Sequence, residues 1–472
     1  MINKIAHKAV LIYPEFDTQA TFWSYAVSLK MYAPANEFGG PKRLLPPLGL
    51  MGLYHHLKPY YDKLCLIDKN IDPRPLKTLI ADADHVYMGG MLPQEHSMLS
   101  LAAEIKAADK CLIVGGTAIT RQSPLMTIAD HLVENEAESI IDELLQGLRT
   151  GHAKHYYKGG FTAPEQFFQP DYSAINMHNY VHMAVQISRG CPESCEFCDI
   201  PSRFGKAYRV TPYAHTAASF QQMKVLGWLG QVFVVDDNFI GHPRRALEIL
   251  KNLHQIGEEI GYHHPKYTEL TLRLADQSEL MSEVRHWFHK AHFINGFYGV
   301  ETPNEASLLE TRKKQNLRGK RSLVEKLRFI SEQTGSGVMI GMIYGFDHDT
   351  TESIEDFINF VNASNAPIVM AGLLNALPYT GLMTRMQNTG RFIQGSSGNN
   401  SDGVINFIPN HFSVQQAEQN YLRILQGIYQ PAAYFARVMR HLQLVDPDLQ
   451  SHYRAGNAKL KYLVKILTQK NA

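Results

Sequence analysis

Short apolar segments alternate with longer amphipathic segments along the first 150 residues. The segments between the apolar runs, such as PPLGLMGLYHHL and PQEHSMLSLAAEIKAA, have the apolar spacing of helices. Short runs in which nearly every residue is apolar are typical of parallel strands buried on both faces. This alternation predicts an α/β domain over residues 1–150 with a doubly wound, Rossmann-like parallel sheet. The predicted strands cover residues 8–14, 63–68, 85–90, 110–116 and 131–135.

A second alternation of the same kind begins near residue 183. Amphipathic helical patterns such as PRRALEILKNLHQIGEEI separate its apolar runs. Six such units predict a partial (β/α)6 TIM-like barrel over residues 181–380, with a second open sheet as the alternative. The predicted strands cover residues 183–188, 231–237, 266–273, 296–301, 337–346 and 367–374.

The remaining segments do not follow the strand–helix pattern. Gly, Pro, Asn and Ser punctuate residues 151–180, which we predict to be a linker. Residues 14–46 are aromatic and polar together, as in a cap over a ligand or a surface excursion packed on the sheet. Residues 381–472 have helical periodicity and form a predicted helical C-terminal region. After Asp448 this region has five basic residues and no acidic one, which fits a helix that touches an anionic membrane or an ordinary solvated helix.

Composition excludes several classes of protein. The chain has 472 residues, with 46 Lys and Arg against 45 Asp and Glu, so its formal charge is +1. This balance argues against general nucleic-acid binding by a basic surface and against an acidic disordered protein. The apolar runs are too short for a membrane span or a signal peptide. Five cysteines in a chain of this length are not a disulfide scaffold, so we expect a reducing, cytoplasmic location, at most at the inner face of the membrane.

Paired glycines end two strands of the first predicted sheet. Gly89 and Gly90 close one strand, and Gly115 and Gly116 close the next. Glycines at the carboxyl ends of parallel strands let a ligand approach the backbone closely, although tight turns need glycine as well.

Three cysteines lie within eight positions, in the sequence ISRGCPESCEFCDIP. Cys191, Cys195 and Cys198 directly follow the first predicted strand of the barrel, and catalytic groups of such barrels lie at the carboxyl ends of strands. Three thiolates suit an iron–sulfur cluster or zinc. Structural zinc is held by four protein ligands, and no fourth cysteine or suitably spaced histidine is nearby. The pattern therefore favours a 4Fe–4S cluster with one iron left open. The chain has 22 histidines, and none has a spacing that demands a metal.

The cysteine segment resembles the motif of the radical S-adenosylmethionine superfamily, Cys-x3-Cys-x2-Cys with an aromatic residue, here Phe197, before the last cysteine. The resemblance implies that the three cysteines hold the cluster and that its open iron binds S-adenosylmethionine. One electron, from a donor such as flavodoxin or ferredoxin, then cleaves the cofactor to a 5′-deoxyadenosyl radical. That radical abstracts hydrogen from an unactivated C–H bond.

The resemblance covers nearly the whole chain. The order of domains is similar to that of radical S-adenosylmethionine enzymes with an N-terminal cobalamin-binding domain, and most of all to the branch that contains the hopanoid C-2 methylase and related lipid-modifying enzymes. The matching stretches are PPLGLMGL (46–53), VGGTAIT (114–120), ENEAE (134–138), VVDDNFIG (234–241), GVETPNE (299–305), GMIYGFD (341–347), LLNALPYTGL (373–382) and SDGVINFIP (401–409).

The resemblance also implies roles for residues at the ends of the barrel strands. It implies that Asp236, Asp237 and Asn238 line the amino group of S-adenosylmethionine. Without the resemblance, the same residue types also fit the N-cap of a helix. Glu269 and Glu301 end or line later strands of the barrel, where a carboxylate could bind ribose hydroxyls or a polar group of the substrate. The alternative is a structural ion pair with an arginine such as Arg273. Gly341 and Gly345 are expected near the adenosine, where the absence of a side chain would allow close packing.

Cobalamin contacts are expected in the first domain. An apolar wall is expected from Pro47, Leu48 and Gly49. The motif Asp-x-His-x-x-Gly of cobalamin proteins with a histidine ligand is absent, because Asp84 and His85 are adjacent in ADHVYMGG. The domain therefore binds cobalamin without a histidine ligand, or binds none. The other expected contacts are Gly89, Gly90, Gly115, Gly116 and Thr117.

Two enzymatic functions follow, together with one that is not enzymatic. With cobalamin, the enzyme methylates an unactivated carbon of a small, apolar or lipid-like substrate. Without cobalamin, the same radical drives coupling, cyclisation, oxidation or rearrangement. An iron–sulfur sensor is disfavoured, since it would not need the acidic residues and glycines at the strand ends of the barrel.

Overall fold

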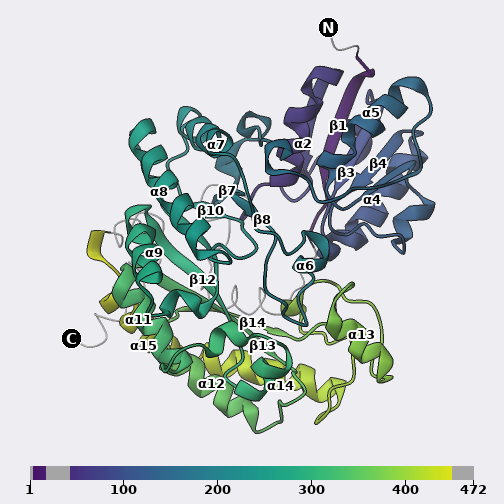
Figure 1. The fold of residues 1–472 in the computed structure, drawn as a ribbon. Coiled ribbons are helices and arrows are strands. Elements are labelled where there is room, and N and C mark those ends of the chain that lie inside the picture. The colour runs from purple at the N-terminus through teal and green to yellow at the C-terminus, as the bar shows by residue number, and fades with distance from the viewer. Residues whose placement is uncertain (1–3, 17–42, 449–472) are drawn as a thin grey trace.

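The computed structural model describes residues 4–16 and 43–448, and within them two six-stranded parallel sheets organise the chain (Figure 1). Most of the predicted cap at residues 14–46 and the basic segment after Asp448 lie outside the described residues.

The first sheet has the strand order β2-β1-β3-β4-β5-β6, and every neighbouring pair is parallel. Its strands are β1 (Ala6–Tyr13), β2 (Tyr61–Asp68), β3 (His85–Gly89), β4 (Cys111–Gly115), β5 (His131–Glu134) and β6 (Tyr156–Lys158). Its helices are α2 (Leu48–Leu57), α3 (Leu76–Ile80), α4 (Glu95–Ala107) and α5 (Ile141–Thr150).

Alternate residues of β1 enter two separate apolar cores, as the two-residue period of a strand requires. Val10 and Ile12 belong to the core that also holds residues of α3 and α4, whereas Ala9 and Leu11 belong to the core with α2 and α5. Helices therefore cover both faces of the sheet, which confirms the predicted doubly wound domain. The strand β6 was not predicted, and it falls in the segment that we expected to be a linker.

The second sheet has the order β14-β13-β12-β11-β10-β7, again with every pair parallel. In the described residues β7 and β14 are its two edges, so this is the predicted partial barrel. Its strands are β7 (Met183–Val185), β10 (Val232–Val234), β11 (Lys266–Leu270), β12 (Phe293–Glu301), β13 (Gly337–Tyr344) and β14 (Ile368–Leu373). The helices between them are α6 (Ile200–Arg203), α7 (Tyr213–Val225), α8 (Pro243–Ile260), α9 (Glu279–Lys290), α10 (Glu305–Glu310), α11 (Leu323–Thr334) and α12 (Ser353–Ala363).

A short antiparallel ribbon, which the sequence pattern did not indicate, brackets the cysteine segment. It pairs β8 (Ser188–Arg189) with β9 (Arg209–Val210). The ribbon begins three residues after β7, so the cysteine segment follows the carboxyl end of that strand and leads into α6.

The C-terminal region covers the edge strand β14 of the barrel. It comprises α13 (Gly381–Asn388), a 3-10 turn (Asn400–Asp402), α14 (Val414–Ile428) and α15 (Pro431–Leu444). The Tyr421 hydroxyl donates to the Ala371 carbonyl at 3.0 Å, and the Tyr429 hydroxyl bonds both the N–H and the carbonyl of Val369. Phenol groups therefore occupy the hydrogen-bonding positions that a further strand would use. Within the described residues, no helix has the length and apolarity needed to cross a membrane.

Candidate functional site

The loop that carries the three cysteines is fixed at its first residue by a glycine. Gly190 has φ +95°, and a Cβ there would lie 2.3 Å from the Ala207 carbonyl oxygen. Its N–H donates to the Asp237 carboxylate at 2.8 Å, and the Cys191 N–H donates to the Gly205 carbonyl at 3.1 Å. The backbone therefore enters the loop in a conformation that only glycine adopts without strain.

Two amides point at cysteine sulfurs. Asn238 Nδ2 lies 3.8 Å from Cys191 Sγ, and Gln315 Nε2 lies 3.4 Å from Cys195 Sγ. Burial raises the pKa of the Cys195 thiol, while the Lys313 ammonium and the Gln315 amide act in the opposite direction. Hydrogen bonds to sulfur and nearby positive charge are means by which proteins stabilise iron–sulfur clusters.

The three thiols are not all as close together as a single zinc ion requires. Tetrahedral zinc with Zn–S bonds of about 2.3 Å would bring its sulfurs within about 4 Å of one another. Among the described residues, no group of three potential ligands that includes these cysteines has its ligand atoms within 4.8 Å of one another. The donor set and its surroundings fit a cluster better than the zinc alternative.

The acidic pair after β10 supports the cysteine loop. Asp236 is buried and accepts from the Ile187 N–H at 2.8 Å and the Ser188 hydroxyl at 2.6 Å. Burial raises the pKa of Asp236 to about 7 and that of Asp237 to about 6. Neither residue caps a helix, because His242 is the N-cap of α8.

Asn238, next to this pair, has a free acceptor. Its Oδ1 is buried and accepts no hydrogen bond within the described residues, while its Nδ2 points at Cys191. A buried acceptor without a donor is costly unless a ligand supplies one. Asn238 is therefore positioned for a ligand N–H group beside the cysteines.

Glu301, at the end of β12, forms a buried ion pair with a lysine rather than an arginine. Lys313 Nζ lies 2.6 Å from Glu301 Oε1, and both side chains are about nine-tenths buried. Glu301 has φ +71°, an uncommon conformation for a residue with a side chain. Such strain persists only where the surroundings fix it, and it is frequent at functional sites.

Glu269, in β11, is solvent-accessible and has no side-chain hydrogen bond or ion pair in the described structure, so the alternative role, an ion pair with Arg273, is not observed. Surrounding protein, with the charges of Asp237 and Glu301, raises the pKa of Glu269 to about 7. The carboxylate is therefore available to a ligand.

The two barrel glycines differ in what they permit. A Cβ on Gly341 would approach the Phe297 ring to 3.0 Å. Gly345 has φ +110°, and its N–H donates to the buried Asp349 carboxylate at 2.9 Å. Gly341 allows close packing between strands, whereas Gly345 forms a turn.

The paired glycines of the first sheet meet each other. Gly116 has φ +99°, and a Cβ there would lie 2.3 Å from the Gly90 carbonyl oxygen. A Cβ on Gly90 would meet the Met98 sulfur at 2.6 Å, and one on Gly89 would meet Leu50 at 2.9 Å. Gly116 is therefore required by packing against backbone, whereas Gly89 and Gly90 lie against the ends of flexible side chains. Gly115 meets only Val133, at ordinary contact distance.

The other predicted contacts lie at the same carboxyl edge. Thr117 is half-buried just after the glycines, and Pro47 is buried before α2. Leu48 is half-buried, and Gly49 is exposed with no atom within 4 Å of a Cβ built there. Open space at this edge thus lies beside Gly49.

Buried ion pairs join the first domain to the cysteine loop, and sequence reasoning missed them. Glu136, just after β5, is 3.4 Å from the Arg189 guanidinium and accepts two hydrogen bonds from Arg209. Glu138 is 3.1 Å from Arg189, the residue two positions before Cys191. The only available signal was the alternation of glutamates in ENEAE, since their partners lie about 50 to 70 residues away.

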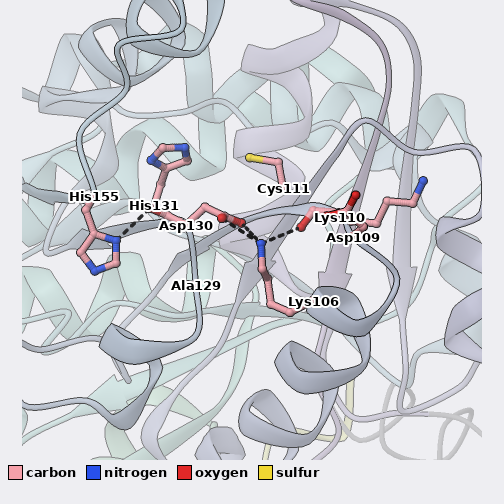
Figure 2. A pocket seen from close by; sticks show the side chains of 8 residues that line it. All are labelled: Lys106, Asp109, Lys110, Cys111, Ala129, Asp130, His131 and His155. Atoms are coloured by element: carbon pink, nitrogen blue, oxygen red, sulfur yellow. Dashed lines mark hydrogen bonds and ion pairs between the residues drawn. The ribbon is translucent and has the colours of Figure 1, made fainter.

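A pocket of about 560 Å³ lies at the opposite edge of the first sheet (Figure 2). An ion pair of 2.7 Å between Lys106 and Asp130 crosses it, and Cys111 lines it at the start of β4. Burial raises the pKa of the Cys111 thiol to about 11, so this cysteine carries little thiolate at neutral pH. The pocket lies at the amino ends of β4 and β5, whereas the predicted contacts lie at the carboxyl ends.

Comparison with known proteins places this geometry in a family. The chain is 33% identical over 471 residues to an uncharacterized methyltransferase of Synechocystis sp., covering 98% of this chain and 83% of that protein. It is 29% identical over 425 residues to the hopanoid C-2 methylase of Rhodopseudomonas palustris, covering 88% and 78%. The chain belongs to the radical S-adenosylmethionine enzymes with an N-terminal cobalamin-binding-type domain.

Radical S-adenosylmethionine enzymes of this kind also share its fold. The methyltransferase TsrM of Kitasatospora setae, solved with tryptophan and an analogue of S-adenosylmethionine, has a TM-score of 0.65 at 13% identity and covers 99% of this chain and 100% of its own. TsrM has also been solved with cobalamin and a 4Fe–4S cluster. Residues 380–471 match a domain of unknown function, DUF4070. The predicted family and its hopanoid-methylase branch are confirmed.

Proposed function

We propose that this enzyme catalyses cobalamin-dependent methylation of an unactivated carbon on a small, apolar or lipid-like substrate. One observation carries the proposal: buried ion pairs from Glu136 and Glu138 join the carboxyl edge of the first sheet to the cysteine loop. A methyl carrier at that edge and a radical source at the loop would face a common space. The similarity to the hopanoid C-2 methylase supports the substrate class.

The barrel residues would bind and orient S-adenosylmethionine. Cys191, Cys195 and Cys198 would hold a 4Fe–4S cluster, which supplies the electron that cleaves S-adenosylmethionine. The free Asn238 Oδ1 would accept a hydrogen bond from its amino group. The accessible Glu269 carboxylate would accept hydrogen bonds from ribose hydroxyls.

The first domain would bind cobalamin, which carries the methyl group when bound, against the open space beside Gly49 and Gly115. Leu48 and Thr117 would complete this contact. Gly89, Gly90 and Gly116 would act by keeping the strand ends close together, since their Cβ positions are filled by other atoms. His85 is unsuited as a cobalt ligand, because it begins β3 at the other edge and bonds Tyr61 at 2.9 Å.

The reaction also needs an electron donor, for which we propose a flavodoxin- or ferredoxin-type protein in the cytoplasm. Because this electron comes from outside the chain, a chemical reductant should replace the protein donor in a test. This separates the chemistry of the site from the identity of the partner.

The test is anaerobic expression with hydroxocobalamin, followed by reconstitution of the cluster. We expect about one cobalt and four iron atoms per chain, and both 5′-deoxyadenosine and S-adenosylhomocysteine as products with dithionite. The Cys198→Ala variant should lose iron, whereas Cys65→Ala, which changes a cysteine outside the loop, should keep it.

Four iron atoms without cobalt would reject cobalamin-dependent methylation and leave the cobalamin-independent radical reactions. Zinc in place of iron, without cleavage of S-adenosylmethionine, would reject the radical mechanism itself. The role of Glu269 is tested by Glu269→Gln, which should weaken binding of S-adenosylmethionine and leave the iron content unchanged.

A further inference from the structure

Two histidines and a glutamate gather on the outside of the barrel, away from the cysteine loop. His254 and Glu258 are four residues apart on α8, so they share one face of the helix. His263 lies in the turn between α8 and β11. One potential ligand atom from each of the three side chains lies within 4.8 Å of the other two.

The turn after α8 folds back, so that the His263 side chain packs against the helix. Gly261 ends α8 in the left-handed conformation, at φ +65°, and the Tyr262 N–H donates to the Gly257 carbonyl at 2.9 Å. Gly257 makes room for the ring, because a Cβ there would lie 2.1 Å from His263 Nδ1. The local fold therefore seats this imidazole directly against the helix.

The two imidazoles and the carboxylate place their ligand atoms within reach of a single ion. His263 Nε2 lies 2.7 Å from Glu258 Oε1, and the rings of His254 and His263 have centroids 5.2 Å apart. Two imidazoles that share one tetrahedral zinc ion through bonds of about 2.0–2.1 Å have ring centres about 5 Å apart. The observed separation fits that arrangement.

The opposite side of His254 is arranged as it is in metal sites. His254 Nδ1 lies 3.1 Å from the Lys290 carbonyl, so it carries the proton and donates. Histidine ligands typically donate their second ring N–H to a carbonyl or carboxylate, which fixes the tautomer. This contact leaves Nε2 of His254 as the nitrogen with the free lone pair.

We propose that His254, Glu258 and His263 form a binding site for a divalent transition-metal ion, with zinc as its natural occupant. Two imidazoles and one carboxylate are a ligand set that zinc accepts, with water in the fourth position. The ion replaces the proton shared by Glu258 and His263. It thereby links the C-terminal end of α8 to the turn that precedes β11. The site does not depend on the proposed radical chemistry.

The experiment uses the holoenzyme with its cluster in place, dialysed against low-micromolar zinc. We expect about one zinc per chain in the wild type, and affinity at least about tenfold weaker in His254→Ala and Glu258→Gln, each of which removes one of the three ligands. Glu258→Gln keeps the shape of the side chain, so it separates loss of a ligand from loss of fold. The matched control is His286→Ala, which removes an exposed histidine on the neighbouring helix α9 and should bind zinc as the wild type does.

X-ray absorption at the zinc edge identifies the ligands. Nitrogen and oxygen at about 2.0–2.1 Å support the site, whereas sulfur at about 2.3 Å would mean that zinc occupies the cysteines and would overturn it. Absence of zinc from the wild type, or unchanged binding in both ligand variants, would overturn it as well.

Discussion

Arg209 of the barrel ribbon donates two hydrogen bonds, of 2.8 and 2.5 Å, to the carboxylate of Glu136 in the first domain. The same guanidinium donates to the carbonyls of Thr162 and Phe204, so it also holds the segment that follows the cysteines. Glu136 is 3% exposed, which makes this contact between domains a buried one.

Replacing Glu136 should therefore destabilise the whole enzyme. Glu136→Ala leaves the Arg189 and Arg209 guanidiniums without their shared carboxylate, and breaking a buried pair from one side costs about 3–5 kcal/mol. We expect that loss in urea denaturation, together with a reduced iron content. Glu143→Ala, which removes an exposed ion pair with Lys154, should leave the midpoint unchanged. Equal behaviour of the two variants would contradict the importance of the buried contact.

Gly190 should be irreplaceable. Gly190→Ala meets both an unfavourable φ and a carbonyl oxygen at 2.3 Å, so the loop must move. Gly151→Ala is the matched control, because Gly151 also has a positive φ of +73° but has open space around it. We expect a loss of about 1–2 kcal/mol in the control and a markedly larger loss, with little bound iron, in Gly190→Ala. A Gly190→Ala protein that folds and takes up iron normally would show that the loop tolerates the shift.

Lys313 should contribute to stability by neutralising the buried carboxylate of Glu301. Lys313→Met leaves the Glu301 carboxylate buried without a counter-charge, which should cost about 3–5 kcal/mol. Glu301→Gln combined with Lys313→Met removes both charges and should recover part of that loss. A double-mutant cycle by chemical denaturation measures the coupling, and additive effects would argue that the pair is energetically unimportant.

Protonation of two buried histidines should oppose folding in acid. Burial lowers the pKa of His182 and of His264 to about 4. Between about pH 6.5 and 4 these histidines bind protons in the unfolded chain and not in the native state, so their contribution to stability falls as the pH falls through this range. The raised pKa values of Asp236 and Asp237 act in the opposite direction. Each histidine should account for about 2 kcal/mol between pH 7 and 5. Denaturation at both pH values should show that acid costs His182→Gln about 2 kcal/mol less stability than it costs the wild type, and an equal pH effect in the two proteins would refute the assignment.

Periodicity was sufficient to predict most of the fold, because buried parallel strands are uniformly apolar. It failed at β6 and at the ribbon of β8 and β9, where the strands are two or three residues long. A segment such as Tyr156–Lys158 is too short and too polar for its pattern to differ from that of a loop. Its strand conformation depends on pairing with β5.

The candidate site was predictable where the chemistry lies in one short segment. The cysteines and the residues 236–238 are recognisable by spacing, but Gln315 and Lys313 lie over 100 residues beyond the cysteines. No local pattern marks them, since only the packing of the barrel brings the Gln315 amide to the Cys195 sulfur and the Lys313 charge near it. For the same reason, the sequence could not show which of the paired glycines pack against each other in the folded protein.

The hydroxyls of Tyr421 and Tyr429 form hydrogen bonds with the backbone at the edge of β14. Both tyrosines lie in the segment that matches a separate domain family. A boundary drawn at residue 380 from sequence similarity therefore cuts through one folding unit. A chain shortened there would expose a bare strand edge, which is a template for aggregation. Chimeras that exchange specificity between relatives should keep β14 and its tyrosines from the same parent.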